Sequence, residues 1–598
     1  MRIKSAITGL IVAVAITAFA PTHIAGAQNG VIPQVLEQKD IKRYQRVLEL
    51  QGQSRWKQAD KLIKRIENPI LMGHVQFQRY MHPTGYRSRY DELAAWLKDY
   101  ADHPNAWQVY RLARKRQGKA RAPRRPVDTR YPGVTGQSAA PKPPLPQRSR
   151  LERTAITRFF ANTRRYVRRG NPERAEKRYW AMERRGLLVP FEEAAALERI
   201  AASYYYKSNN MKARILSTRA ADLAREIEPQ SDWIAGLAHW RDGNFADAYT
   251  HFAHVGAAER ASGWLLSAGS FWAGRAAYQL GNTESATTHL KAASIHHETF
   301  YGLLAARQLG IKPQIDWSVP ALEQAAVDHL VRHPAARRAI ALSEIGRNDI
   351  ADEELRLLWG REGTTVQTDL LAFAARLNLP NIQIRLGRAG GTGIPASTAV
   401  RYPMPDWEPA GGYTVDRALI FAMVRKESDF RIRAKSRVGA GGLMQVMPAT
   451  ASFITRDRKL RRNRSKLYEP EFNMALGQQY IEHLLDMEYV EGNLFMVLAA
   501  YNGGPGSLIG WRKEVIYEQD PLLFIESIGF YETRNYIERV MANLWLYRMR
   551  LGQETPSLDA TASGAWPSLE SLDTPQTAEI MKKAQARTSN RTTSLAED

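Results

Sequence analysis

The chain has 598 residues and a mass of 67.6 kDa, which is too long for one ordinary domain and predicts several. Hydrophobic residues make up 44% and charged residues 24%, so the chain can bury substantial cores and is not disordered as a whole. Cysteine is absent, which excludes thiol catalysis, disulfides, thiolate zinc sites and a lipid-modified N-terminal cysteine. The formal net charge of +23 favours an anionic partner.

Residues 1–27 have the pattern of a signal peptide. Arg2 and Lys4 precede a mostly apolar stretch. Ala25-Gly26-Ala27 then supplies small residues at the two positions that a signal peptidase recognises. We expect cleavage near Ala27 and an exported mature protein. The alternative is an uncleaved membrane anchor, but the apolar stretch is short for a span of about 20 residues. No second apolar span follows, so we expect no transmembrane anchor.

Residues 28–116 form a predicted N-terminal helical region, because apolar residues recur there at three- and four-residue spacing. The composition changes in residues 117–150, which are rich in Pro, Gly, Lys and Arg and contain Asp128 as their only acid. Helical periodicity is lost over this stretch. The pattern is typical of a semi-rigid basic linker.

Residues 151–386 contain an internal repeat. A Gly followed five residues later by Ala occurs at Gly170, Gly243, Gly281 and Gly346, and the middle pair is 38 residues apart. Small residues at fixed positions let antiparallel helices approach closely, and a period of about 34 to 45 residues is that of helix-pair solenoids such as tetratricopeptide arrays. We therefore predict an α-superhelical domain, with an irregular helical bundle as the alternative. Such a domain presents an extended surface to a long partner.

The C-terminal third divides into three segments. Gly and Pro interrupt the helical pattern over residues 387–412, which predicts a linker to a last domain at residues 413–552. Residues 553–598 are rich in Ser and Thr and poor in apolar residues, so we expect a disordered tail. No strand-rich region occurs, and the predicted fold class is all-α.

Glu427 is unusual because a predicted helix directs its carboxyl toward the buried side. Ile420, Met423 and Val424 form one apolar stripe, and Glu427 lies on the same helical face. Apolar surroundings disfavour the charged carboxylate and raise its pKa, which is what a general acid needs. The ordinary alternative is a glutamate that reaches solvent at a helix end and pairs with a nearby Arg.

A glycine-dense turn follows Glu427 in the sequence. It contains Gly439, Gly441 and Gly442, and glycine permits positive φ and close approach of a ligand to the main chain. Gln445 then offers a hydrogen-bond donor and an acceptor to a polar substrate. Taken alone, such a turn is weak evidence for a site.

The segment that begins with this glutamate matches the pattern E-S-x-F-x-P-x-A-x-S-x-x-G-A-x-G-L-M-Q-x-M-P-x-T-A. The matching residues are Glu427, Ser428, Phe430, Ala434, Ser436, Gly439, Ala440, Gly442, Leu443, Met444, Gln445, Met447, Pro448, Thr450 and Ala451. This segment resembles the lytic transglycosylases with a goose-lysozyme-like catalytic domain, specifically the soluble periplasmic kind with a superhelical N-terminal part. Ile432 stands where that family usually has proline, which affects loop stiffness more than chemistry.

Two later strings resemble further blocks of the same family. VLAAYNGGPG resembles the block A-Y-N-A/G-G-P, and ETRNYI resembles E-T-R-x-Y-V. The resemblance implies that Tyr501 and Asn502 lie at the cleft and that Tyr536 forms a hydrogen bond near Glu427. Considered in isolation, Asn502 could instead be a helix cap and Tyr536 a core residue.

The resemblance implies a complete reaction. Glu427 would protonate the glycosidic oxygen of the β-1,4 bond between N-acetylmuramic acid and N-acetylglucosamine, while the substrate's acetamido group stabilises C1. The carboxylate would then take the proton of the muramic 6-hydroxyl, so that 1,6-anhydromuramic ends form without water. The implied substrate-binding residues are Ser436, Gly442, Met444, Gln445, Tyr501, Asn502 and Tyr536. No metal or cofactor is implied.

The resemblance also completes the predicted fold, an α-superhelix or helix-pair solenoid followed by a lysozyme-like, mainly α catalytic domain. Two other functions stay open. A hydrolytic muramidase would share Glu427 but needs a second carboxylate, and the nearest acid in sequence, Asp429, is directed away from the Glu427 face. A non-catalytic peptidoglycan-binding scaffold would not need Glu427.

Peptidoglycan glycan strands are the expected partner. We expect no nucleic-acid partner, because Lys and Arg are spread along the chain and no reader motif such as a zinc finger occurs. We expect a monomer located in the periplasm. The sequence names no protein of the cell-wall machinery as a partner.

Overall fold

The computed structural model describes residues 30–129, 143–389 and 397–573. Within these ranges the regular elements are helices, and extended pairing is limited to three isolated β-bridges. The all-α prediction is therefore confirmed. None of the described helices combines the length and the hydrophobicity that a membrane crossing requires. The predicted signal peptide lies outside the described residues.

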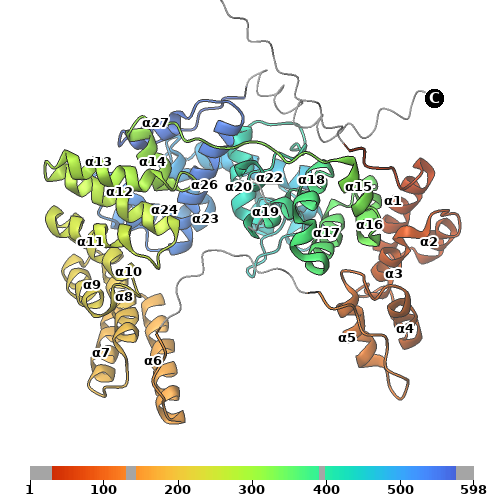
Figure 1. The fold of residues 1–598 in the computed structure, drawn as a ribbon, viewed down its shortest axis with the longest axis horizontal. Coiled ribbons are helices and arrows are strands. Elements are labelled where there is room, and N and C mark those ends of the chain that lie inside the picture. The colour runs from red at the N-terminus through yellow and green to blue at the C-terminus, as the bar shows by residue number, and fades with distance from the viewer. Residues whose placement is uncertain (1–29, 130–142, 390–396, 574–598) are drawn as a thin grey trace, which may run out of the picture.

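The N-terminal region consists of five helices and one 3-10 turn. They are α1 (Gln38–Gly52), α2 (Trp56–Ile63), η1 (Pro69–Leu71), α3 (Met72–Tyr80), α4 (Tyr90–Asp99) and α5 (Ala106–Arg116). These helices lie at the opposite end of the molecule from the next helices in the sequence (Figure 1).

The middle of the chain forms helix pairs in two groups. The first group is α6 (Arg150–Arg168), α7 (Pro172–Glu183), α8 (Pro190–Tyr205), α9 (Asn210–Ala224), α10 (Gln230–Arg241), α11 (Phe245–Ala257), α12 (Gly263–Gln279), α13 (Thr283–Ser294) and α14 (Phe300–Gln308). The second group is α15 (Gln324–Leu330), α16 (Pro334–Glu344), α17 (Asn348–Glu362), η2 (Gly363–Val366), α18 (Gln367–Arg376) and α19 (Pro380–Ala389). A long segment without regular structure crosses the molecule between the groups (Figure 1).

The repeated glycines terminate helices at the turns of this array. Gly170, Gly243, Gly281 and Gly346 all have positive φ, between 63° and 75°, a conformation that glycine adopts without steric cost. An Asn follows the first three, and the side chain of Asn171, for example, accepts a hydrogen bond from the backbone of the next helix. The Gly-Asn pair thus ends one helix and starts the next, which explains the repeat.

The C-terminal domain contains the remaining helices. They are η3 (Thr398–Arg401), α20 (Arg417–Ser428), α21 (Pro448–Thr455), η4 (Arg458–Arg461), η5 (Ser465–Tyr468), α22 (Pro470–Leu485), α23 (Leu494–Gly503), α24 (Pro505–Glu514), α25 (Pro521–Ser527), α26 (Tyr531–Arg550) and α27 (Pro556–Ala562). The long helix α26 and helix α20 lie near the middle of the molecule, between the two groups of helix pairs (Figure 1).

Two large hydrophobic cores divide the molecule differently from the predicted domains. One core continues from α6–α14 into the C-terminal domain, where the Phe300 ring stacks on Trp545 with centroids 5.2 Å apart. The other joins α1–α3 to α15–α19, and α4 and α5 pack around a third, smaller core. The region predicted as one domain at 151–386 therefore contributes to two arms. We call α6–α14 the first arm, and α1–α5 with α15–α19 the second arm.

The predicted tail at 553–598 is wrong for residues 553–573, which are ordered. Helix α27 lies there, and the Trp545 indole donates to the hydroxyl of Ser557 over 3.0 Å. Leu558 is buried, and the Trp566 ring packs against Phe524. This segment contains few apolar residues, but Leu558 and Trp566 pack into the core that the C-terminal domain shares with α6–α14. Composition alone does not reveal these contacts.

The two predicted linkers are also partly ordered. Helix α19 extends to Ala389 inside the predicted linker at 387–412, and η3 follows with Thr398 buried. In the predicted linker at 117–150, Arg148 forms an ion pair with Glu192 over 2.6 Å. Local composition marked these stretches as irregular, but contacts with distant helices order the parts that the structure describes.

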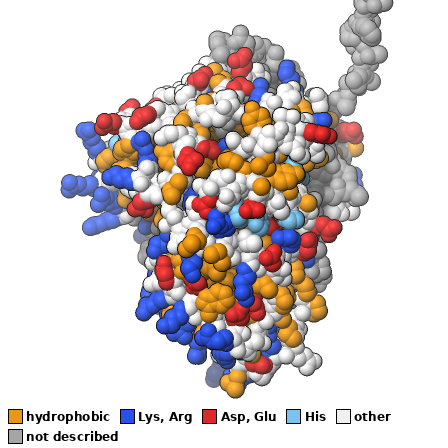
Figure 2. All heavy atoms as spheres, turned by 90° about the vertical axis from the view of Figure 1, so that its left-hand side faces the viewer, with side chains coloured by type: hydrophobic (Ala, Val, Ile, Leu, Met, Phe, Trp, Pro, Cys, Tyr) orange, Lys and Arg blue, Asp and Glu red, His pale blue; other side chains and the backbone are white. Residues whose placement is uncertain are grey.

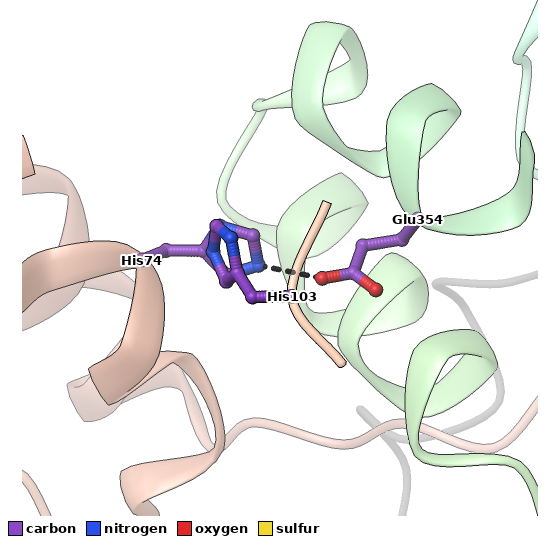
Figure 3. A group of neighbouring side chains, drawn as sticks. All are labelled: His74, His103 and Glu354. Atoms are coloured by element: carbon purple, nitrogen blue, oxygen red, sulfur yellow. Dashed lines mark hydrogen bonds and ion pairs between the residues drawn. The ribbon is translucent and has the colours of Figure 1, made fainter. Parts of the chain in front are cut away.

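A buried hydrogen-bond relay joins the N-terminal helices to α17 (Figure 3). The backbone N–H of Asn105 donates to Nδ1 of His103 over 3.1 Å, so Nε2 of His103 carries the proton and donates to Nδ1 of His74 over 2.8 Å. Nε2 of His74 then donates to Glu354 over 2.9 Å. Arg338 donates to both carboxylate oxygens of Glu354, each over 2.9 Å. Every ring nitrogen of the relay has one partner.

His74, His103 and Glu354 are the one group with metal-ligand spacing among the described residues. Their nitrogen and oxygen atoms already satisfy one another, and the guanidinium of Arg338 neutralises the carboxylate that a cation would need. The geometry therefore fits a structural connection between the two sequence regions of the second arm.

The relay predicts a loss of stability in mild acid. Burial, with smaller contributions from His74 and Arg338, lowers the pKa of His103 well below its ordinary value of 6.5. The unfolded chain takes up this proton near pH 6.5 and the folded protein only at lower pH, so stability falls with decreasing pH below about 6.5, by about 1.4 kcal/mol per pH unit. Thermal unfolding at pH 7.5 and pH 5.0 measures this loss.

The variant His103→Gln should show a smaller loss of melting temperature between the two pH values than the wild type. The matched control is His329→Gln, because His329 is exposed on α15. An identical pH dependence in the wild type and His103→Gln would contradict the assignment.

Candidate active site

Helix α20 positions Glu427 one residue before its own C-terminal end. The helix starts at a buried N-cap, Asp416, which accepts from the backbone of Leu419 over 3.2 Å. It ends because Asp429 and Phe430 both take left-handed conformations, with φ of 49° and 61°. The apolar stripe predicted for this helix is fully buried at Ile420, Met423 and Val424.

The Glu427 carboxyl is partly buried at this helix end. Burial raises its pKa to about 7, an interaction with the hydroxyl of Tyr536 and the charge of Lys426 oppose this rise, and the charge of Glu532 adds to it. A carboxyl with this pKa is about half protonated at neutral pH, so it can both donate and accept a proton there.

Two parallel tyrosine rings lie beside Glu427. Tyr501 of α23 and Tyr536 of α26 have ring planes only 6° apart and centroids 6.3 Å apart. Burial and the charge of Glu427 raise the pKa of both phenols, so both hydroxyls stay protonated and available as donors. The Tyr501 hydroxyl donates to the carbonyl of Met444 over 2.8 Å. The Tyr536 hydroxyl is buried and has no partner at hydrogen-bond distance within the described residues, but it lies close enough to the Glu427 carboxyl to lower its pKa.

Asn473 of α22 holds the glycine-rich turn in place. Its side chain accepts from the backbone N–H of Met444 over 2.8 Å and donates to the carbonyls of Gly441 and Leu467 over 3.0 and 2.9 Å. Gly442 has φ of 83°, and a Cβ there would lie 2.1 Å from the Leu467 oxygen. The sequence analysis missed Asn473. A signal existed, because a polar residue begins the buried run that continues with Met474 and Leu476.

Three predicted substrate-binding residues shape this turn. The Ser436 hydroxyl accepts from the backbone N–H of Gly439 and of Ala440 over 3.1 and 2.9 Å. Gln445 has φ of 48°, and its amide donates to the carbonyl of Gly442 over 2.7 Å. Gln445 is partly exposed, whereas Gly442 is buried.

The remaining predicted residues lie around the tyrosine pair. The Met444 side chain is fully buried and packs on Gly477 of α22, so only its main chain faces Tyr501. Asn502 belongs to the last turn of α23 and accepts from the hydroxyl of Thr533 over 2.8 Å. The contacts therefore connect the turn, Tyr501, Tyr536 and Glu427.

Two helical arms flank a small helical domain that carries Glu427 beside a tyrosine pair, and this arrangement is that of a lysozyme-like domain on a superhelical frame. Residues 407–521 match the family described as "Transglycosylase SLT domain".

Curated relatives align over less than half of the chain. The soluble lytic murein transglycosylase of Escherichia coli K12 is 27% identical over 44% of this chain and 41% of its own length. The corresponding protein of Salmonella typhimurium LT2 is 29% identical over 43% and 40%. The membrane-bound lytic murein transglycosylase C of Edwardsiella ictaluri is 39% identical over 21% and 41%. The aligned region spans about two fifths of the length of these relatives.

Two solved structures share the fold along most of the chain. The 70 kDa soluble lytic transglycosylase of Escherichia coli superposes with a TM-score of 0.57 and 17% identity, covering 89% of this chain and 99% of that one. Its complex with bulgecin A has a TM-score of 0.55, 16% identity and the same coverage. The chain therefore has the fold of a soluble lytic transglycosylase, and the predicted superhelix followed by a lysozyme-like domain is confirmed.

Two substitutions should shift the Glu427 pKa in opposite directions. Tyr536→Phe removes the hydroxyl that lowers this pKa and should raise it above about 7. Glu532→Gln removes a nearby negative charge and should lower it. Carbon-detected NMR titration of glutamate-labelled protein measures both, with Glu488→Gln, an exposed residue of the same domain, as the control. Shifts of the same sign in both variants would refute the described electrostatics.

Replacing Asn473 should destabilise the turn. Asn473→Leu removes the partner of the buried N–H of Met444 and one donor to the carbonyls of Gly441 and Leu467, while Gly441 keeps its bond from the N–H of Val446, at a cost of about 1–3 kcal/mol. Denaturant unfolding measures this cost. Asn463→Leu is the control, since Asn463 is exposed in the neighbouring segment and bonds only to Ser465. An equal effect of both substitutions would mean that the three hydrogen bonds of Asn473 do not anchor the turn.

Proposed function

We propose that this protein is a lytic transglycosylase that cleaves the β-1,4 bond between N-acetylmuramic acid and N-acetylglucosamine in peptidoglycan and leaves 1,6-anhydromuramic ends. The observation that carries the proposal is Glu427, a single carboxyl with a pKa of about 7 beside a tyrosine pair. The family match at residues 407–521 and the names of the relatives support it.

Glu427 would act twice in this reaction. Protonated, it donates to the glycosidic oxygen as the bond to C1 breaks, and the substrate's own acetamido group stabilises C1. Ionised, it takes the proton of the muramic 6-hydroxyl, whose oxygen then bonds to C1. The carboxyl is protonated again at the end, so no water is consumed. A pKa near neutrality suits both steps, because neither protonation state is costly to reach.

Other protein groups would orient this carboxyl and the sugar. We propose that Tyr536 holds the Glu427 carboxyl through its buried hydroxyl and that Tyr501, Asn502 and Gln445, which are partly exposed, contact the substrate. Ser436, Gly442 and Met444 would contribute through the main chain of the turn that they shape. No step needs a metal or cofactor.

The hydrolytic alternative needs a second carboxylate opposite Glu427. Asp429 is occupied by Arg388, which donates to both of its oxygens over 2.7 Å. Glu532 is the one other acid that acts on the Glu427 pKa, and it is exposed on the first turn of α26. A muramidase would therefore depend on Glu532, whereas a transglycosylase would keep its product type without it.

We further propose that the mature protein is exported to the periplasm and acts there as a monomer, with the two arms guiding glycan strands. The first arm shares its core with the C-terminal domain, where the Tyr301 hydroxyl donates to Glu526 over 2.6 Å. Deleting the arm would expose this core. The role of the first arm in guiding glycan strands is therefore better tested with surface substitutions than with truncation.

The decisive experiment compares products and variants. Wild-type protein acting on sacculi should release muramyl ends that are lighter by one water than those of a lysozyme digest, as measured by mass spectrometry. Glu427→Gln keeps the shape but neither donates nor takes the proton, so turnover should fall by at least about 10² to 10⁴. Glu532→Gln is the matched control and should keep the anhydro product. Ends that carry a free reducing group with oxygen from labelled water would show a muramidase instead.

A further inference from the structure

Basic residues concentrate on two segments of the C-terminal domain, although they looked evenly spread in the sequence. Residues 431–437 and 456–466 together contain eleven Lys or Arg and one acid, Asp457. We call the basic residues of these segments the cationic collar: Arg431, Arg433, Lys435, Arg437, Arg456, Arg458, Lys459, Arg461, Arg462, Arg464 and Lys466. Arg464 is partly buried, and the other ten are exposed.

The two segments flank the glycine-rich turn of the candidate active site. Lys435 pairs with Gly441 in an isolated bridge, which brings the first segment against the turn. The second segment lies on the other side, because a Cβ at Gly439 would lie 3.0 Å from the Arg464 guanidinium. The Arg433 guanidinium also lies over the Tyr468 ring, 5.1 Å from its centroid. The collar is therefore one surface around the turn.

Contacts connect this surface to Glu427. The turn that carries the first segment is held by Asn473, and its Met444 carbonyl accepts from Tyr501. The Tyr501 ring is parallel to that of Tyr536, which interacts with the carboxyl of Glu427. A ligand bound to the collar would thus lie against the turn that Tyr501 contacts.

Acids lie near one of the two segments. Arg431, Arg433 and Lys435 line a pocket that also includes Asp349, Asp352 and Glu353 of the second arm. The second segment contains one acid, Asp457, whose side chain accepts from the backbone N–H of Lys459 over 2.9 Å and caps η4. None of the eleven basic side chains forms an ion pair in the described part of the chain. Like charges without ion-pair partners repel one another, which disfavours the compact state unless an anion binds there.

We propose that the cationic collar binds carboxylates carried along the glycan strand, so that the protein cleaves anionic strands faster than neutral ones. This proposal rests on the proposed function and specifies its substrate class. A polymer fits better than a membrane, because the collar surrounds the turn beside Glu427 and a flat bilayer on it would cover the approach to that carboxyl. Charge attraction at this position raises the local concentration of substrate and acts on KM more than on kcat.

A matched pair of variants tests the proposal. The collar variant carries Arg458→Gln, Arg461→Gln and Arg462→Gln, which are exposed and are not among the residues that hold the turn. The control carries Arg158→Gln, Arg164→Gln and Arg184→Gln, which are exposed on α6 and at the end of α7 and change the net charge equally. Lys and Arg also gather toward the lower end of the face in Figure 2, where these helices lie. Equal melting temperatures of both variants show that they fold.

The substrates are native sacculi and sacculi whose carboxylates have been converted to neutral amides with glycinamide and a carbodiimide. We expect the wild type and the control to cleave native sacculi about tenfold more efficiently at low salt, a typical size for several exposed charge contacts. This advantage should shrink in about 1 M salt, where the screening length falls to about 3 Å. The collar variant should lose the advantage through KM and keep its kcat on amidated sacculi. Arg462→Lys should retain the advantage, because it retains the charge.

The outcomes separate the two proposals. A wild type that cleaves neither substrate would refute the proposed function itself. Anhydro products at equal rates from native and amidated sacculi, or a collar variant that keeps the full advantage, would overturn the collar proposal and leave the function standing. Loss of binding to phosphatidylglycerol vesicles in the collar variant, with its preference for native sacculi unchanged, would identify a membrane surface and also overturn the proposal.

Discussion

The packing of α20 on α26 is the constraint on which the candidate site depends. Asn543 of α26 donates to the Ala422 carbonyl over 3.1 Å and accepts from Arg425 over 2.8 Å. About two turns nearer the start of α26, Asn535 accepts from Lys426 over 2.9 Å. These bonds fix the last turn of α20 just before Glu427. The carboxyl is thereby held near Tyr536, and its burial raises its pKa.

The same helix connects the site to the frame of the molecule. Trp545 and Tyr547 of α26 are fully buried, and they contact the first arm through Phe300 and the η3 segment through Tyr402. Helix α26 therefore belongs at once to the core of the C-terminal domain and to the junction with the arm. The two arms are attached by different means, since the second arm has its own core and contacts the C-terminal domain through polar bonds of Arg388 and Asn381 to Asp429.

Features set by neighbouring residues could be predicted from the sequence. The stripe that ends at Glu427 follows from helical spacing, and the glycines at helix ends follow from the positive φ that they permit. Features that depend on distant contacts could not be predicted. Asn473 acts through three carbonyl and amide partners outside its own helix, and His74 acts through Glu354, which is 280 residues away. Residues 553–573 are ordered for the same reason, because they pack on a core built from distant parts of the sequence.

The core that the first arm shares with the C-terminal domain determines how the folded state breaks down. Arm helices such as α14 and the site helix α26 bury one another's aromatic rings, so neither half keeps its interior when the other opens. The two halves should behave as one cooperative unit, in which local opening of the arm is a route to irreversible inactivation of the site. A protease that cuts the arm would thereby disrupt the candidate site without reaching Glu427.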